Sequence, residues 1–240
     1  HIEKELNSLN YSSRNYKDYD KELLLIKDEV IDFLKNTQIQ KWNKLNDSYG
    51  IDTEKKVLQR ISSEISKRGI IDVLRNQVAD RGVYLDLCYF QPKSDLNPDL
   101  QKLYSFNKFT LVRQLHYSTE YENSIDIVLF LNGLPILTME LKNKATGQNY
   151  KHAEYQYKND RDPNEPFLRF KRCMVHFCVD KHNVSMTTRL SGRKTFFLPY
   201  NRDIENPPVD SGYSTKYLWE EILHPDSILD IIENFVHLAN

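Results

Sequence analysis

The chain has 240 residues, with 33 Lys and Arg residues against 34 Asp and Glu residues, and 40% of its residues are hydrophobic. This composition is typical of a globular protein and excludes a disordered or fibrous chain. No apolar run approaches the roughly 18 residues of a membrane-spanning helix. Three widely spaced Cys residues favour free thiols in the cytoplasm, where we expect the protein to act. The chain starts without Met and without a signal peptide, so we expect a fragment of a longer protein.

The near-neutral total charge hides a basic segment. Residues 142–202 contain 13 Lys and Arg residues but 5 Asp and Glu residues, and residues 181–202 contain no acidic residue. A concentrated basic segment on a neutral protein favours a surface that binds a polyanion. A solvated charged face explains the same composition equally well.

The first 80 residues are predicted to be mainly helical. Apolar periodicity predicts helices over residues 2–10 and 23–34. Asp52 and Thr53 can begin a third helix that runs to about Lys67 and ends at Gly69, and a further helical turn is predicted over 73–78.

Strands dominate the predicted core, residues 81–200. They are expected over 83–90, 109–117, 125–131, 135–142, 173–179, 184–189 and 195–198, with a helix over 150–159. Helices over 217–223 and 227–238 complete a C-terminal part, residues 213–240. Helices around a central run of strands predict a single α/β domain with a mixed central β-sheet over residues 1–240.

The pair Asn132-Gly133 predicts a hairpin between the strands over 125–131 and 135–142. Residues two apart in a strand share a face, so Glu140 and Lys142 project together. The acidic residue of the other strand is Asp126.

The register of this hairpin decides whether Asp126 joins them. A two-residue loop would place Asp126 opposite Met139, whose side chain faces the other way. A three-residue loop over residues 132–134 would place Asp126 opposite Glu140. We therefore predict the three-residue loop, or an equivalent β-bulge.

Two carboxylates on adjacent strands repel each other unless a cation lies between them, and oxygen ligands of this kind suit Mg²⁺. A neighbouring Lys142 can orient or help to deprotonate a water and balance charge in the transition state. Together they predict metal-assisted phosphodiester hydrolysis. A surface ion pair at the strand ends is the alternative, but both strands are otherwise apolar, so charges there need a reason.

The order Asp126, hairpin, Glu140-Leu141-Lys142 resembles the PD-(D/E)xK nuclease motif, with Ile125 where the motif has Pro. The sequence of residues 125–135 and 140–143 is similar to the N-terminal nuclease domain of type I restriction enzyme R subunits (HsdR). The similarity extends to residues 112–118, 156–158, 160–163, 170–172, 187–190 and 217–221.

This resemblance implies a restriction-endonuclease-like fold and a magnesium site. Asp126 and Glu140 would bind Mg²⁺, with the Leu141 carbonyl as a further ligand, and Lys142 would be the catalytic Lys. Glu3, on the first predicted helix, is the candidate for an additional metal ligand.

The family's Gln-x-x-x-Tyr motif is not reproduced here, because Ala153 lies four residues before Tyr157. Gln156 is the candidate catalytic residue on that helix. Candidates for contacts to DNA phosphates come from the basic segment: Lys144, Lys151, Lys158, Arg189, Arg193 and Lys194.

The resemblance also implies non-specific cleavage of double-stranded DNA after ATP-driven translocation by C-terminal motor domains. The methyltransferase (M) and specificity (S) subunits would be partners, and we expect no membrane partner. The chain lacks a GxxxxGK[ST] loop, so ATP is expected only in the motor domains. The alternative is a non-catalytic DNA-clamping or subunit-docking domain on the same fold, whose acidic pair is structural.

Overall fold

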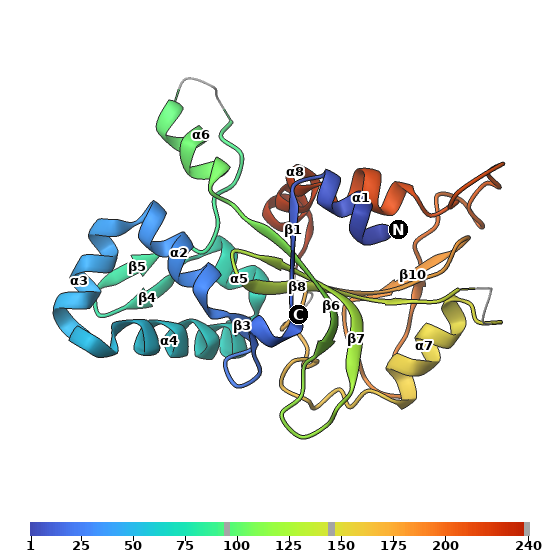
Figure 1. Ribbon diagram of the computed structural model, residues 1–240, viewed down its shortest axis with the longest axis horizontal. Coiled ribbons are helices and arrows are strands. Elements are labelled where there is room, and N and C mark those ends of the chain that lie inside the picture. Colours follow the sequence, from blue (N-terminus) through green and yellow to red (C-terminus); the bar gives the residue numbers. More distant parts are fainter. Residues whose placement is uncertain (94–96, 144–146, 238–240) are drawn as a thin grey trace.

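A seven-stranded mixed sheet forms the centre of the computed structural model, which describes residues 1–93, 97–143 and 147–237 (Figure 1). The strands pair antiparallel except for two parallel pairs, β1 with β6 and β8 with β9. The α/β class with a mixed sheet flanked by helices is therefore confirmed. In spatial order the strands are β1 (Tyr11–Arg14), β6 (Phe109–His116), β7 (Ser124–Leu131), β8 (Leu134–Leu141), β9 (Val175–Val179), β10 (Val184–Thr187) and β11 (Leu198–Pro199).

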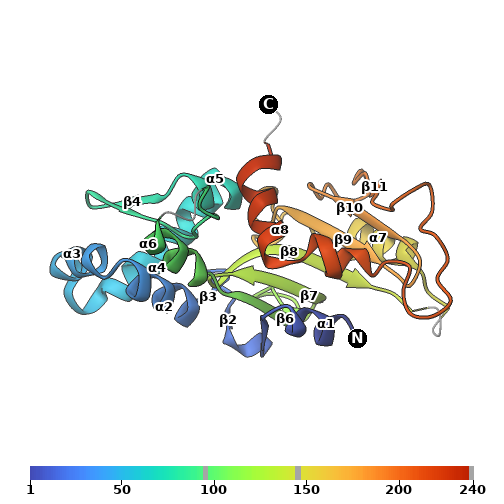
Figure 2. The same ribbon diagram turned by 90° about the horizontal axis from the view of Figure 1, so that it is seen from above.

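The two faces of the sheet pack against different helices (Figures 1 and 2). Ile127 and Leu129 of β7 belong to a core with α1 (Ile2–Ser8), the π-helical turns η4 (Leu218–Ile222) and η5 (Ile231–Phe235), and α8 (Pro225–Asp230). Val128 and Phe130 belong to a second core, with α7 (Tyr150–Asn159). This alternation is the period of two that places successive strand residues on opposite faces.

Much of the N-terminal half forms a helical part beyond one end of the sheet (Figure 1). Its helices pack apolar side chains such as Leu34, Leu45 and Ile61 into the first core. It contains η1 (Tyr16–Asp18), β2 (Tyr19–Asp20), β3 (Leu25–Ile26), α2 (Lys27–Thr37), α3 (Ile39–Tyr49), η2 (Gly50–Asp52), α4 (Thr53–Arg68), α5 (Ile70–Arg75), β4 (Val78–Asp80), β5 (Val83–Leu85) and α6 (Pro98–Ser105).

Several predicted boundaries are wrong in this half. The helix predicted over 23–34 begins at Lys27, because Leu25 and Ile26 pair as a strand with β2. The strand predicted over 83–90 ends at Leu85, because the Gln38 side chain bonds both backbone groups of Asp86 at 2.8 Å. Helices α3 and α6 are additional to the predicted elements.

The β7–β8 hairpin contains the expected irregularity in an unexpected place. Leu131 pairs with Leu134, so the loop is only Asn132-Gly133 and the predicted three-residue loop is wrong. The register then shifts between Leu129 and Phe130, so that Ile127 pairs with Met139. The equivalent bulge that we predicted is confirmed, and the next residues along the two strands, Asp126 and Glu140, are opposite each other.

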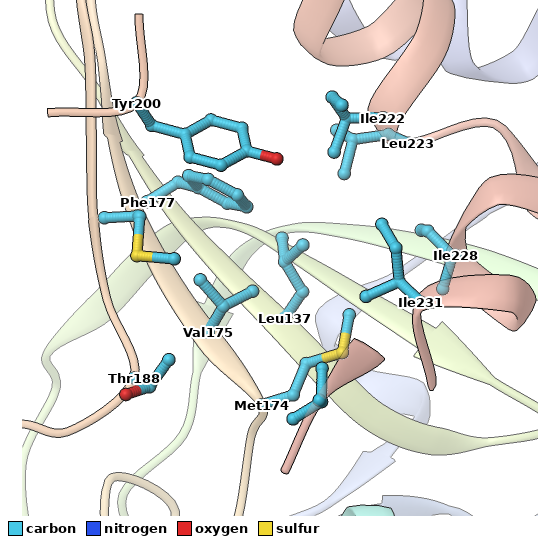
Figure 3. A pocket seen from close by; sticks show the side chains of 12 residues that line it. Leu137, Met174, Val175, Phe177, Thr188, Tyr200, Ile222, Leu223, Ile228 and Ile231 are labelled. Carbon is cyan, nitrogen blue, oxygen red and sulfur yellow. The ribbon is translucent and has the colours of Figure 1, made fainter. Parts of the chain in front are cut away.

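An apolar cavity of about 100 Å³ lies between the sheet and the C-terminal helices (Figure 3). Leu137, Phe177, Ile228 and Ile231 point into it. The cavity opens on the face opposite α7 and its lining contains no ionisable acid or base except the Tyr200 hydroxyl. It is therefore not a place for phosphodiester chemistry.

The hairpin turn gives a test of its packing. Gly133 has φ +81°, and a Cβ there would lie 2.5 Å from the Ile26 carbonyl oxygen and 2.8 Å from Val30 Cγ2. Gly82 has a similar φ of +77° but open space around it. We expect Gly133→Ala to lower the free energy of unfolding by about 1–3 kcal/mol more than Gly82→Ala, because only the first is overpacked. Urea unfolding measures the difference, and equal losses would contradict the close packing of the turn.

Candidate active site

The central feature of the site is a pair of carboxylates on adjacent strands. Asp126 lies near the start of β7 and Glu140 near the end of β8, on the face that α7 covers. Burial raises the pKa of Glu140, and the negative charge of Asp126 raises it further, as expected for two like charges in one site. The structure thus brings the two predicted metal ligands together.

Glu140 is almost completely buried, with 1% of its surface exposed. Its Oε1 accepts a hydrogen bond from the Arg161 guanidinium at 2.9 Å, whereas its Oε2 has no hydrogen-bond partner within the described ranges. The pKa of Glu140 is raised to about 7, chiefly by burial, while the Arg161 charge opposes the rise. A buried carboxylate with one free oxygen is suited to bind a cation.

Asp126 is held by two donors. Its Oδ1 accepts from the Gln114 amide at 2.7 Å, and its Oδ2 accepts from the backbone N–H of Leu141 at 2.8 Å. Gln114 interrupts the pairing of β6 with β7 and has φ +47°, a strained conformation for a residue with a side chain. Such strain is often found at functional sites.

Lys142 lies one residue beyond Leu141 and is half-buried. Its Nζ donates to the Gln156 Oε1 on α7 at 2.6 Å. The structure therefore brings together all four predicted catalytic residues, Asp126, Glu140, Lys142 and Gln156. Their roles stay predictions.

Glu3 is not brought to this site. Its carboxylate forms an ion pair with Arg113 at 3.0 Å and accepts from the Ser13 hydroxyl at 2.9 Å. The physical reason is that α1 packs on the face of the sheet opposite α7. Within residues 1–93, 97–143 and 147–237, no three His, Cys, Asp or Glu side chains are grouped to hold a metal. The backbone N–H of Leu141 donates to Asp126, and the carbonyl oxygen of the same residue stays a predicted metal ligand.

The predicted DNA-contacting residues divide into three groups. Lys144 lies outside the described residues. Lys151 pairs with Glu154 at 3.0 Å, and the Arg189 guanidinium lies over Phe170. Lys158 lies over Phe197, and Arg193 and Lys194 are exposed on the adjoining loop, where a Cβ on Gly192 would lie 3.9 Å from the Lys158 carbonyl oxygen.

Sequence reasoning missed two residues that contact the carboxylates, Gln114 and Arg161. Gln114 falls within a predicted strand, and only the register of β6 against β7 shows that it is opposite Asp126. Arg161 follows α7 and belongs to a segment, residues 160–163, that carries the family resemblance. That segment was the only signal for it.

Comparison with known families defines the class of protein. The profile of the family described as "Type I restriction enzyme R protein N terminus" matches residues 1–195. The chain therefore belongs to this family of N-terminal regions of type I restriction enzyme R proteins. No helix in the described ranges is long and apolar enough to span a membrane.

A second similarity is shorter. Acireductone dioxygenase 2 of Physcomitrium patens is 31% identical over 81 residues, which cover 29% of this chain and 42% of that protein. The chain thus spans less than half of that relative's length. A match of this extent carries no argument for a dioxygenase activity in this chain.

The buried setting of Glu140 can be measured directly. We expect its carboxyl group to titrate near pH 7 in the metal-free protein, because burial disfavours the charged form. Asp126→Asn should move the midpoint to lower pH, since it removes a like charge. Carbon-detected NMR of labelled Glu side chains measures both, and Glu140→Gln identifies the signal.

Asp99→Asn is the matched control, because Asp99 is an exposed carboxylate on α6. It should leave the midpoint unchanged. A Glu140 midpoint near 4.5, the ordinary value for a Glu side chain, would contradict the burial of this carboxylate.

Proposed function

We propose that this region cleaves double-stranded DNA endonucleolytically in a Mg²⁺-dependent reaction, as the nuclease of a type I restriction R subunit. The observation that carries the proposal is the Asp126–Glu140 pair with one buried, unpartnered Glu140 oxygen among the described residues. The Lys142–Gln156 contact lies beside it. Membership of the R-protein family agrees with this activity.

The donor set fits a hard divalent cation. Carboxylate oxygens from Asp126 and Glu140 are the ligands that Mg²⁺ favours, and the Leu141 carbonyl is a third candidate. Bound Mg²⁺ would polarise a phosphoryl oxygen and lower the pKa of a water. Two ligands suit this ion, since Mg²⁺ usually keeps several waters and shares phosphate oxygens.

Lys142 has the protons and the position for the remaining chemistry. Gln156 accepts one hydrogen bond from its ammonium group, which leaves two donors for a water or a phosphate oxygen. Because Gln156 is on α7 and Lys142 follows β8, the contact fixes the Lys142 side chain near the carboxylates. Its positive charge would stabilise the negative charge that develops on phosphorus oxygens in the transition state.

Delivery of DNA is assigned to other parts of the complex. We propose that motor domains of the same subunit hydrolyse ATP and move the duplex, and that the M and S subunits select the target. The nuclease then cuts without reading sequence, in the cytoplasm. Exposed Arg and Lys residues such as Arg193 and Lys194 could hold the duplex through its phosphates, contacts that carry no sequence information directly.

Removing a metal ligand or the Lys separates this function from a structural role. In the full R subunit with its M and S subunits, Asp126→Asn and Lys142→Ala should each reduce DNA cleavage by at least about 100-fold while ATP hydrolysis and translocation continue. Lys55→Ala, on an exposed Lys of α4, is the control and should cut normally. Unchanged cleavage in both variants, or loss of complex assembly, would instead support a clamping or docking domain.

The basic loop beside α7 gives a separate test. We expect the double variant Arg193→Ala/Lys194→Ala to weaken duplex binding equally on unrelated sequences. The slope of log affinity against log salt should decrease by about 0.9 for each phosphate that the loop no longer neutralises. Fluorescence anisotropy at several salt concentrations measures this, with Lys55→Ala as control. An unchanged slope would show that this loop does not contact DNA phosphates.

A further inference from the structure

Arg161 is a buried cation at the centre of the site. It is 7% exposed, so it is poorly placed to contact a DNA backbone. One guanidinium nitrogen donates both to Glu140 Oε1 at 2.9 Å and to the Ser124 carbonyl oxygen at 2.6 Å. Arg161 therefore links the end of β8 to the first residue of β7, the two strands that bear the carboxylates.

Ser124 extends this link to the second carboxylate. Its hydroxyl donates to Gln114 Oε1 at 2.9 Å, and the amide nitrogen of the same Gln114 donates to Asp126 Oδ1 at 2.7 Å. Hydrogen bonds thus connect Glu140, Arg161, Ser124, Gln114 and Asp126 in one chain. When each member makes its hydrogen bond, such a network fixes the Glu140 and Asp126 side chains relative to each other.

The contact of Arg161 with Glu140 is one-sided. A guanidinium can bind both oxygens of a carboxylate with two parallel hydrogen bonds, and that is the strongest arrangement. Here Arg161 binds Oε1 alone, and Oε2 is buried with no partner among the residues that the structure describes. A salt bridge that served stability alone would be expected to satisfy both oxygens.

We propose that Arg161 is a positioning residue that holds Glu140 by one oxygen, so that the other oxygen is directed to the cation shared with Asp126. This inference rests on the proposed Mg²⁺ site. Side chains that orient metal ligands typically contribute about 10–100-fold to metal affinity or activity. Arg161 has this orienting role for Glu140, and Gln114 has it for Asp126.

The test is Mg²⁺ binding to the full R subunit without nucleotide, measured by calorimetry. The site is defined as the binding that Asp126→Asn abolishes. We expect Arg161→Gln to weaken that binding about 10–100-fold. Arg161→Lys should fall between wild type and Arg161→Gln, because its ammonium group keeps the charge but lies on a shorter side chain than the Arg161 terminal nitrogen that contacts both Glu140 and Ser124.

Arg169→Gln is the matched control. Arg169 lies on the same connection, is exposed, and donates to a backbone carbonyl rather than to a carboxylate. It should bind Mg²⁺ as the wild type does, and thermal unfolding of every variant verifies the fold. In cleavage assays, high Mg²⁺ should restore cutting by Arg161→Gln but not by Lys142→Ala.

The outcomes separate the two proposals. If Arg161→Gln binds Mg²⁺ as tightly as the wild type, the positioning role is overturned. If it binds Mg²⁺ more tightly, the role is also overturned, and Arg161 instead competes with the metal for Glu140. If Arg161→Gln fails to fold, Arg161→Lys decides, and wild-type affinity in that variant overturns the inference. A wild-type protein without a site sensitive to Asp126→Asn would overturn the Mg²⁺ proposal itself.

Discussion

The site depends on one irregularity in the β7–β8 hairpin. From the turn, Leu131 pairs with Leu134, and a regular ladder would continue until Asp126 met Met139. Successive side chains alternate between faces, so Glu140 would then be out of line with Asp126. The extra residue in β8 shifts the register by one and sets the two carboxylates opposite each other. The proposed metal site depends on that shift.

The shift also places a charge where charge is costly. Glu140 lies near the end of a strand whose preceding residues are all buried, and a carboxylate in such a position is destabilised unless it is paired. The ion pair between Arg161 and Glu140 Oε1 offsets part of this cost. Glu140 Oε2 has no hydrogen-bond partner among the described residues. A buried charge that is only partly paired lowers stability, and such a loss is typical of a residue kept for binding.

Sequence patterns were most reliable where structure is local. The Asn132-Gly133 turn, the strands beside it and the bounds of α7 follow from residues that are neighbours in the chain. Arg161 and Gln114 could not be assigned to the carboxylates because their contacts depend on strand register and on the path of the chain after α7. The structure does not group Glu3 with these carboxylates, and the sequence could not show this for the same reason. Periodicity predicts that it is on a helix, but not which face of the sheet that helix covers.

The position of Gln156 shows how local and distant interactions combine. Asn149 caps α7 through its side chain, and the next N–H, that of Tyr150, donates to the buried Asp180 at the end of β9. Because β9 runs parallel to β8, this bond fixes the start of α7 beside the strand that ends just before Lys142. Two turns later Gln156 meets the Lys142 ammonium. The geometry of the Lys is therefore set by a helix cap and a strand pairing, and neither of these is part of the three-residue motif.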